Sequence, residues 1–105
     1  MNFYPSDVMT MGKNDIPNEY ITNEVLFCGF RFYVDGRAYI SDKNAELLAQ
    51  EGIKITKHSH TNPVVIDVGC GCGSIGLAIA LLNKNIKHLL LTDISKSAIE
   101  VARIN

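Results

Sequence analysis

The sequence lacks an excess of charge of either sign. Its 10 lysines and arginines are nearly balanced by 11 aspartates and glutamates, which leaves a formal net charge of -1 over 105 residues. No strong positive field therefore favours a nucleic acid as a partner. With 47% hydrophobic residues, the composition is typical of one small globular domain with a single core.

Targeting and membrane-spanning segments are also missing. Residues 1–7 have neither the basic nor the apolar region of a signal peptide. The apolar run over residues 75–82 is too short to cross a bilayer, because a spanning helix needs about 20 apolar residues. The three cysteines are an odd set, and Cys70 and Cys72 are poor disulfide partners because one residue separates them in a glycine-rich turn. We expect a soluble, cytoplasmic protein in a reducing compartment, with no membrane association.

The first part of the chain predicts an N-terminal arm and then a β-hairpin. Residues 1–23 are polar and mixed and show no sustained hydrophobic period, so we expect an arm rather than a packed element. Residues 30–34 and 37–40 are aromatic and β-branched stretches on either side of Asp35-Gly36. That dipeptide accepts the positive φ of a type I′ turn, which predicts a hairpin around it.

A helix and a loop are predicted to complete the segment 24–62 that precedes the core. Asp42 can cap a helix whose apolar residues lead to Gly52, a natural C-terminal stop. Residues 57–62 are polar and end at Pro63, which predicts a loop.

Residues 63–105 predict alternating strands and helices. Residues 64–68 have the pattern of a buried strand, and residues 86–92 that of a second apolar strand. Between them, residues 74–82 form a predicted helix that is apolar nearly all round, which implies burial on most sides. This order is typical of a parallel sheet with crossover helices.

The last helix has two candidate caps, Ser95 and Ser97. We expect Ser97, because Glu100 lies three residues later and completes a capping box.

A glycine-rich turn between two acidic residues is the candidate ligand-binding feature of the sequence. Asp67 is followed by Gly69, Gly71 and Gly73 where the first strand becomes a helix, and Asp93 ends the second strand. Glycines let a backbone approach a ligand closely, and the N–H groups at the start of the helix favour a polar group. A carboxylate at the end of the second strand can accept hydrogen bonds from ribose hydroxyls. The pattern predicts a site for a nucleoside-containing cofactor.

Two other interpretations of these residues are open. Residues 71–76 also satisfy the dinucleotide pattern G-x-G-x-x-G, with Asp93 at a plausible distance for the ribose of NAD. Asp67 favours the ammonium or sulfonium end of S-adenosylmethionine, because a carboxylate there would repel a pyrophosphate. A metal site is not expected, because the candidate cysteines and histidines lack the spacing that zinc ligands have. These candidates are Cys70, Cys72, His58, His60 and His88.

At this point the sequence resembles the class I methyltransferases. Residues 65–73 are similar to the first motif of that class, and Thr92-Asp93-Ile94-Ser95 with the following helix is similar to its second-strand motif. The resemblance implies an α/β fold, a partial Rossmann-like class I methyltransferase fold preceded by a β-hairpin. It also implies S-adenosylmethionine as cofactor, bound by Asp67, Gly69, Gly71, Gly73, Asp93 and Ile94.

Within the class, the chain resembles the HemK-type protein-glutamine methyltransferases. Those enzymes carry a hairpin and a Pro-Arg-x-Asp-Thr-Glu segment before the first motif, and residues 40–48 fall in its place. Ser41-Asp42 stands where the family has Pro-Arg, and Asn44-Ala45 replaces Asp-Thr. The resemblance implies methyl transfer to a nitrogen, with a release factor as the protein substrate.

The acceptor half of that apparatus is not found in the chain. The family holds the acceptor nitrogen with an Asn-Pro-Pro-Tyr segment, and the 105 residues contain none. We therefore assign no catalytic residue and expect a truncated, cofactor-binding half that is inactive alone and forms a homo-oligomer or pairs with a complementing chain. A non-catalytic interaction module, an rRNA guanine methyltransferase-like fragment and an NAD-binding fragment are the alternatives.

Overall fold

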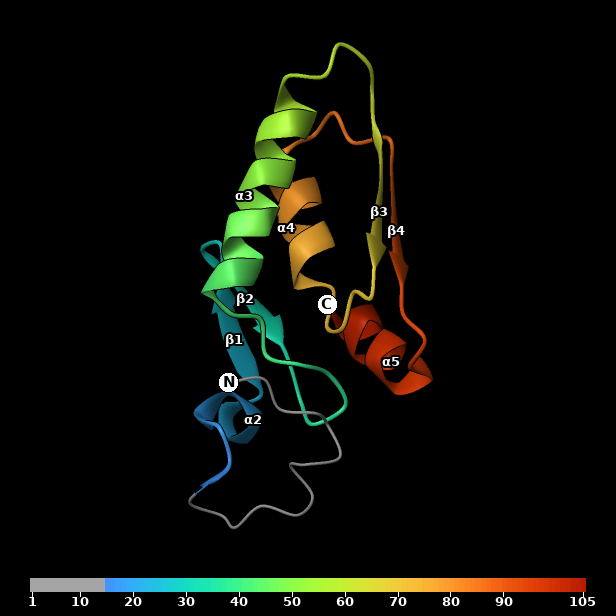
Figure 1. Ribbon diagram of the computed structural model, residues 1–105. Coiled ribbons are helices and arrows are strands. Elements are labelled where there is room, and N and C mark those ends of the chain that lie inside the picture. The colour runs from blue at the N-terminus through green and yellow to red at the C-terminus, as the bar shows by residue number, and fades with distance from the viewer. Residues whose placement is uncertain (1–14) are drawn as a thin grey trace.

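The computed structural model describes residues 15–105 and shows an α/β arrangement (Figure 1). None of the helices within this described part is long and apolar enough to cross a membrane. In chain order, the elements are α2 (Asn18–Thr22), β1 (Glu24–Phe27), β2 (Phe30–Tyr33), α3 (Lys43–Lys57), β3 (Val64–Val68), α4 (Ser74–Leu82), β4 (His88–Thr92) and α5 (Lys96–Ile104).

Strands β3 and β4 form the parallel pair that the sequence predicts. Their register runs from Val64 opposite His88 to Val68 opposite Thr92. The crossover between them is α4, which begins and ends where the sequence predicts, and α3 packs beside α4 (Figure 1). Parallel strands need such a crossover, because a short turn cannot reverse the chain direction twice. The predicted partial Rossmann-like fold with a preceding hairpin is confirmed.

The hairpin itself lies earlier in the chain than predicted. Strands β1 and β2 pair antiparallel around Cys28-Gly29, whose φ angles of 50° and 81° are both positive. Two positive φ angles are what a two-residue hairpin turn of type I′ requires. The prediction of a hairpin around Asp35-Gly36 is therefore wrong. The Asp35 carboxylate instead accepts hydrogen bonds from the backbone and guanidinium of Arg37, which forms a local turn after β2.

Part of the predicted arm is a packed helix. Residues 1–14 lie outside the described residues, but α2 lies within the segment 1–23 for which we expected an arm. Tyr20 on α2 is buried, and its hydroxyl donates a hydrogen bond of 2.7 Å to the carbonyl oxygen of Ala38. That contact connects α2 to a loop beyond the hairpin, which a local hydrophobic period does not reveal.

Helix α3 begins as predicted but does not end at Gly52. The Asp42 carboxylate accepts a hydrogen bond of 2.9 Å from the Ala45 backbone N–H, which confirms the N-cap. The helix continues to Lys57, so the predicted stop is wrong. A Cβ at Gly52 would lie 2.6 Å from Cδ1 of Ile79, so glycine here allows α3 and α4 to pack closely.

Helix α5 is capped by the first of the two candidate serines. The Ser95 hydroxyl accepts a hydrogen bond of 3.3 Å from the Ala98 N–H, so the choice of Ser97 is wrong. The reason is that Asp93 Oδ1 accepts a hydrogen bond from the Ser95 N–H at 2.9 Å. This contact turns the chain directly after β4 and starts the helix at the earlier serine.

Burial of the core strand is lower than predicted. The buried hydrophobic core joins the hairpin to α4 and α5 through residues that include Phe27, Phe32 and Val101. On β3, however, alternate side chains are exposed, with Ile66 at 60% and Val68 at 82% of their full exposure. The expectation of a buried strand is wrong for one side of β3 in the described chain, because helices cover only one face of the β3–β4 sheet (Figure 1).

The last turn of α4 and the start of β4 also differ from the predictions. Leu81 and Leu82 are exposed, so α4 is buried on fewer sides than its apolar sequence suggests. Strand β4 begins at His88 rather than at residue 86.

Candidate functional site

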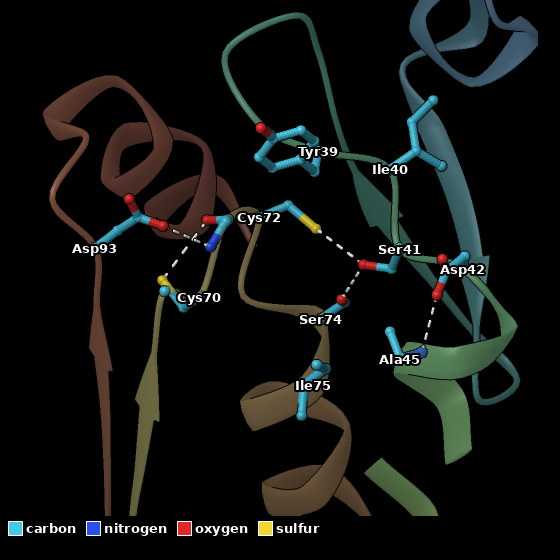
Figure 2. A pocket seen from close by; sticks show the side chains of 12 residues that line it. Tyr39, Ile40, Ser41, Asp42, Ala45, Cys70, Cys72, Ser74, Ile75 and Asp93 are labelled. Atoms are coloured by element: carbon cyan, nitrogen blue, oxygen red, sulfur yellow. Dashed lines mark hydrogen bonds between the residues drawn. The ribbon is translucent and has the colours of Figure 1, made fainter. Parts of the chain in front are cut away.

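A pocket of about 550 Å³ lies at the carboxyl ends of β3 and β4 (Figure 2). One wall is the glycine-rich turn with the first residues of α4, and the opposite wall is formed by residues of the segment 39–45. Asp93, directly after β4, lines the end of the pocket. The volume of the pocket is within the range of about 300 to 1,000 Å³ found for small-molecule sites.

The glycines of the turn have different tasks. Gly69, Gly71 and Gly73 all adopt positive φ, at 72°, 56° and 88°. A Cβ at Gly69 or Gly71 would meet no atom within 4 Å, and both residues line the pocket, so their missing side chains leave open space there. A Cβ at Gly73 would instead lie 3.1 Å from Leu91 Cδ1. The first two glycines therefore provide room for a ligand, whereas the third allows α4 to pack.

Asp93 connects the turn to the next helix. Its Oδ2 accepts a hydrogen bond of 3.0 Å from the Gly71 N–H, and its Oδ1 accepts one of 2.9 Å from the Ser95 N–H. A carboxylate offers about four lone-pair sites, so both oxygens can still accept hydrogen bonds from ligand hydroxyls.

Asp67 lies outside the pocket lining, behind the turn. Its Oδ2 accepts a hydrogen bond of 3.0 Å from the Gly76 N–H in the first turn of α4. Burial raises the pKa of this carboxyl group, and the negative charge of Asp93 adds to that rise, while the Gly76 hydrogen bond opposes it. Burial, together with Asp67 and Asp93, also raises the pKa of the Cys70 thiol to about 11. Through its hydrogen bond to the Gly76 N–H, Asp67 holds β3 to the start of α4.

The structure brings together only some of the residues that the sequence selects. Gly69, Gly71 and Asp93 line the pocket, whereas Gly73 packs behind it. The side chain of Ile94 is fully exposed and is not part of the lining.

Sequence reasoning included no residue of the opposite wall in the predicted cofactor site, although Tyr39, Ser41 and Asp42 line the pocket. The signal that could have found it is the position of residues 40–48, which correspond to a segment preceding the first motif of the resembled family.

The charge of the lining is negative. Among the described residues that line the pocket, Asp42 and Asp93 are carboxylates, and there is no lysine, arginine or histidine. Such a lining favours a ligand with positive charge over one with a pyrophosphate. No group of three or more cysteine, histidine or acidic side chains within residues 15–105 could hold a metal ion.

Comparisons with known proteins match most of the chain. The sequence profile of the family called methyltransferase small domain matches residues 39–105. The chain is 34% identical over 99 residues to the release factor glutamine methyltransferase of Clostridium acetobutylicum, which covers 94% of this chain and 34% of that protein. The corresponding protein of Leptospira interrogans is 32% identical over 104 residues, covering 99% of this chain and 36% of its own length. The chain therefore spans about a third of the length of the curated relatives it matches.

Proposed function

Because this chain belongs to the methyltransferase small domain family and is HemK-like, we propose that its pocket binds S-adenosylmethionine. The observation that carries the proposal is the open space at Gly69 and Gly71, on the pocket wall next to the Asp93 carboxylate. When bound, the cofactor would supply a methyl group already activated on a sulfonium sulfur.

Different residues of the chain have different roles in the proposed binding of the cofactor. We assign the Asp93 carboxylate to the ribose hydroxyls, since both of its oxygens keep lone pairs after their backbone contacts. Gly69 and Gly71 let the backbone approach the ligand. Asp67 acts indirectly, by holding Gly76 and thereby the junction of the turn and α4. We keep Ile94 as a cofactor-binding residue, because its exposed side chain follows Asp93 directly.

Methyl transfer to glutamine is a further step of the proposal. Relatives of this chain are named release factor glutamine methyltransferases, and we propose the same class of acceptor here. No Asn-Pro-Pro-Tyr segment occurs in the 105 residues, so we assign cofactor binding to this chain and acceptor binding to further polypeptide. We accordingly expect no methyl transfer by the isolated chain.

Isothermal titration calorimetry with S-adenosylhomocysteine and with NAD tests the proposal. We expect S-adenosylhomocysteine to bind and NAD to bind more weakly, because Asp42 and Asp93 oppose a pyrophosphate. Gly71→Arg is the control, since its side chain would enter the open space at that position. Tighter binding of NAD would contradict the assignment and favour the dinucleotide interpretation of residues 71–76.

A further inference from the structure

Two side chains from distant parts of the chain hold Cys72, the residue between the last two glycines of the turn. Cys72 is only 1% exposed. The Asn105 amide Nδ2 donates a hydrogen bond of 2.9 Å to the Cys72 carbonyl oxygen. On the pocket side, Ser41 Oγ lies 3.9 Å from Cys72 Sγ and shares a hydrogen bond with Ser74 Oγ (Figure 2). Cys72 is therefore held through both its backbone and its side chain.

The amide of Asn105 also holds the hairpin. Its Oδ1 accepts a hydrogen bond of 2.7 Å from the Tyr33 N–H, and its Nδ2 donates one of 2.9 Å to the Tyr33 carbonyl oxygen. Both hydrogens of the amide nitrogen are therefore used, one on Tyr33 and one on Cys72. One side chain at the end of α5 thus joins the last residue of β2 to the glycine-rich turn.

The turn needs such external support because of its own sequence. Gly71 and Gly73 both adopt positive φ, and glycine has more backbone conformations available than any other residue. Inside the turn, the Gly73 N–H donates to the Cys70 carbonyl oxygen at 2.9 Å, and Asp93 holds the Gly71 N–H. Cys72 is where the hairpin and the opposite pocket wall restrain the turn from outside.

From these contacts we propose that Asn105 and Ser41 are positioning residues for the cofactor pocket. They keep the glycine-rich turn at a set separation from the wall that contains Ser41, so that the pocket is shaped before the ligand arrives. This inference rests on the proposed binding of S-adenosylmethionine for its functional consequence. The restraint of Cys72 itself is a property of the chain without ligand, and each part has its own test.

The ligand-free test is the rate at which a thiol reagent modifies Cys72, followed by peptide mass spectrometry. Asn105→Ala and Ser41→Ala should each speed the labelling of Cys72, because the turn opens more often. Cys28, in the turn between β1 and β2, is the internal reference for Ser41→Ala, in which its rate should not change. Ser41→Thr keeps the hydroxyl and should restore the slow rate. Ser59→Ala is the matched control, since it removes an exposed hydroxyl pair with Thr61.

The ligand test is calorimetry of the same variants with S-adenosylhomocysteine. Ser41→Ala should weaken binding about five- to tenfold, as expected for the loss of about one hydrogen bond. Asn105→Ala, which removes three hydrogen bonds, should weaken it at least as much. Ser59→Ala should bind as the wild type does, and Ser41→Thr, which keeps the hydroxyl, should bind more tightly than Ser41→Ala. Circular dichroism and urea unfolding identify any variant that fails to fold, and Ser41→Ala, which changes a single hydroxyl group, decides the matter if Asn105→Ala does not fold.

The two tests separate the possible failures. Unchanged labelling of Cys72 in Ser41→Ala would overturn the restraint, whether or not ligand binds. Faster labelling with unchanged affinity would overturn the role in binding. If the wild type does not bind S-adenosylhomocysteine, the proposed function is wrong, and with it the role of both residues in cofactor binding.

Discussion

At the scale of single residues, Asp93 is the side chain on which the proposed cofactor binding should depend most. It holds the Gly71 N–H with one oxygen and the Ser95 N–H with the other, and it lines the pocket. A charged acceptor of this kind makes stronger hydrogen bonds than a neutral one. The carboxylate therefore has a structural role, and we propose a second role for it in binding the cofactor.

Asp93→Ala should weaken binding of S-adenosylhomocysteine by about 1.5 to 3 kcal/mol, because charge-assisted hydrogen bonds to the ribose are lost. Calorimetry measures the change, and Glu24→Ala, which removes a carboxylate from an exposed pair with Arg31, is the control. Equal affinities of Asp93→Ala and the wild type would show that the ribose does not contact this carboxylate.

Asp35 makes the stability of the fold depend on pH. Its Oδ2 lies 2.7 Å from Nη2 of Arg37, and the Tyr33 hydroxyl donates to the same oxygen at 3.0 Å. The Arg37 hydrogen bonds are the largest cause that lowers the pKa of Asp35, to about 2. A carboxyl group with a lowered pKa stabilises the folded state above its unfolded pKa of about 3.9, and this contribution is lost as the pH falls towards the folded value.

We expect the difference in unfolding free energy between the wild type and Asp35→Asn to be constant above pH 5 and to shrink between about pH 4 and pH 2. Urea unfolding at a series of pH values gives this difference directly. Asp67 acts in the opposite sense, because its pKa is raised, but it is present in both proteins and cancels. A difference that persists undiminished at pH 2 would mean that the Asp35 pair does not form.

At the scale of elements, the glycines at the junction between the glycine-rich turn and α4 have different surroundings. Gly71 leaves open space in the pocket, whereas a Cβ at Gly73 would meet Leu91 and Leu77 at 3.1 and 3.2 Å. Both have positive φ, which costs about 1 to 2 kcal/mol for a residue with a side chain. The two positions should therefore respond differently to the same substitution.

Gly73→Ala should lower the unfolding free energy more than Gly71→Ala, because it adds crowding to the same backbone cost. Gly71→Ala should instead weaken the binding of S-adenosylhomocysteine. This loss of affinity should be larger than its smaller loss of unfolding free energy would explain. Urea unfolding and calorimetry on the two variants form a matched pair, each serving as the control of the other. If both variants lose stability and affinity in the same proportion, the division of tasks between the glycines is wrong.

At the scale of the whole molecule, the β3–β4 sheet leaves apolar side chains uncovered. Val64, Ile66 and Val68 on β3 and Leu90 on β4 are exposed, and within residues 15–105 strand β3 pairs only with β4. Open strand edges and apolar patches favour association. With a net charge of -1, copies of the chain hardly repel one another, so a second copy is the partner that we propose for this surface in the isolated protein.

The isolated chain should therefore self-associate at micromolar concentration, and Ile66→Lys should shift it towards the monomer. Light scattering over a range of concentrations measures both. Ile21→Lys, which changes an exposed isoleucine on α2, is the control and should not alter the association. A wild-type chain that is a stable monomer and unfolds cooperatively would contradict the proposal. If the chain can be purified only together with a different polypeptide, that result would favour a complementing chain.

Local sequence patterns were sufficient to predict the parallel pair, the bounds of α4 and the place of Asp93 beside the glycine-rich turn. These features depend on residues that are neighbours in the chain or that end adjacent parallel strands. A strand followed directly by glycines and an apolar helix has few alternatives, because its backbone must satisfy its hydrogen bonds locally.

Only the tertiary structure decided the features that depend on distant partners. Cys28-Gly29 rather than Asp35-Gly36 makes the hairpin. Gly52 lies inside α3, where a side chain would collide with Ile79 of α4. The restraint of Cys72 by Asn105 joins residues that are 33 positions apart in the sequence. No hydrophobic period or motif in the sequence predicts such a contact, because the contact forms only when separate elements pack together.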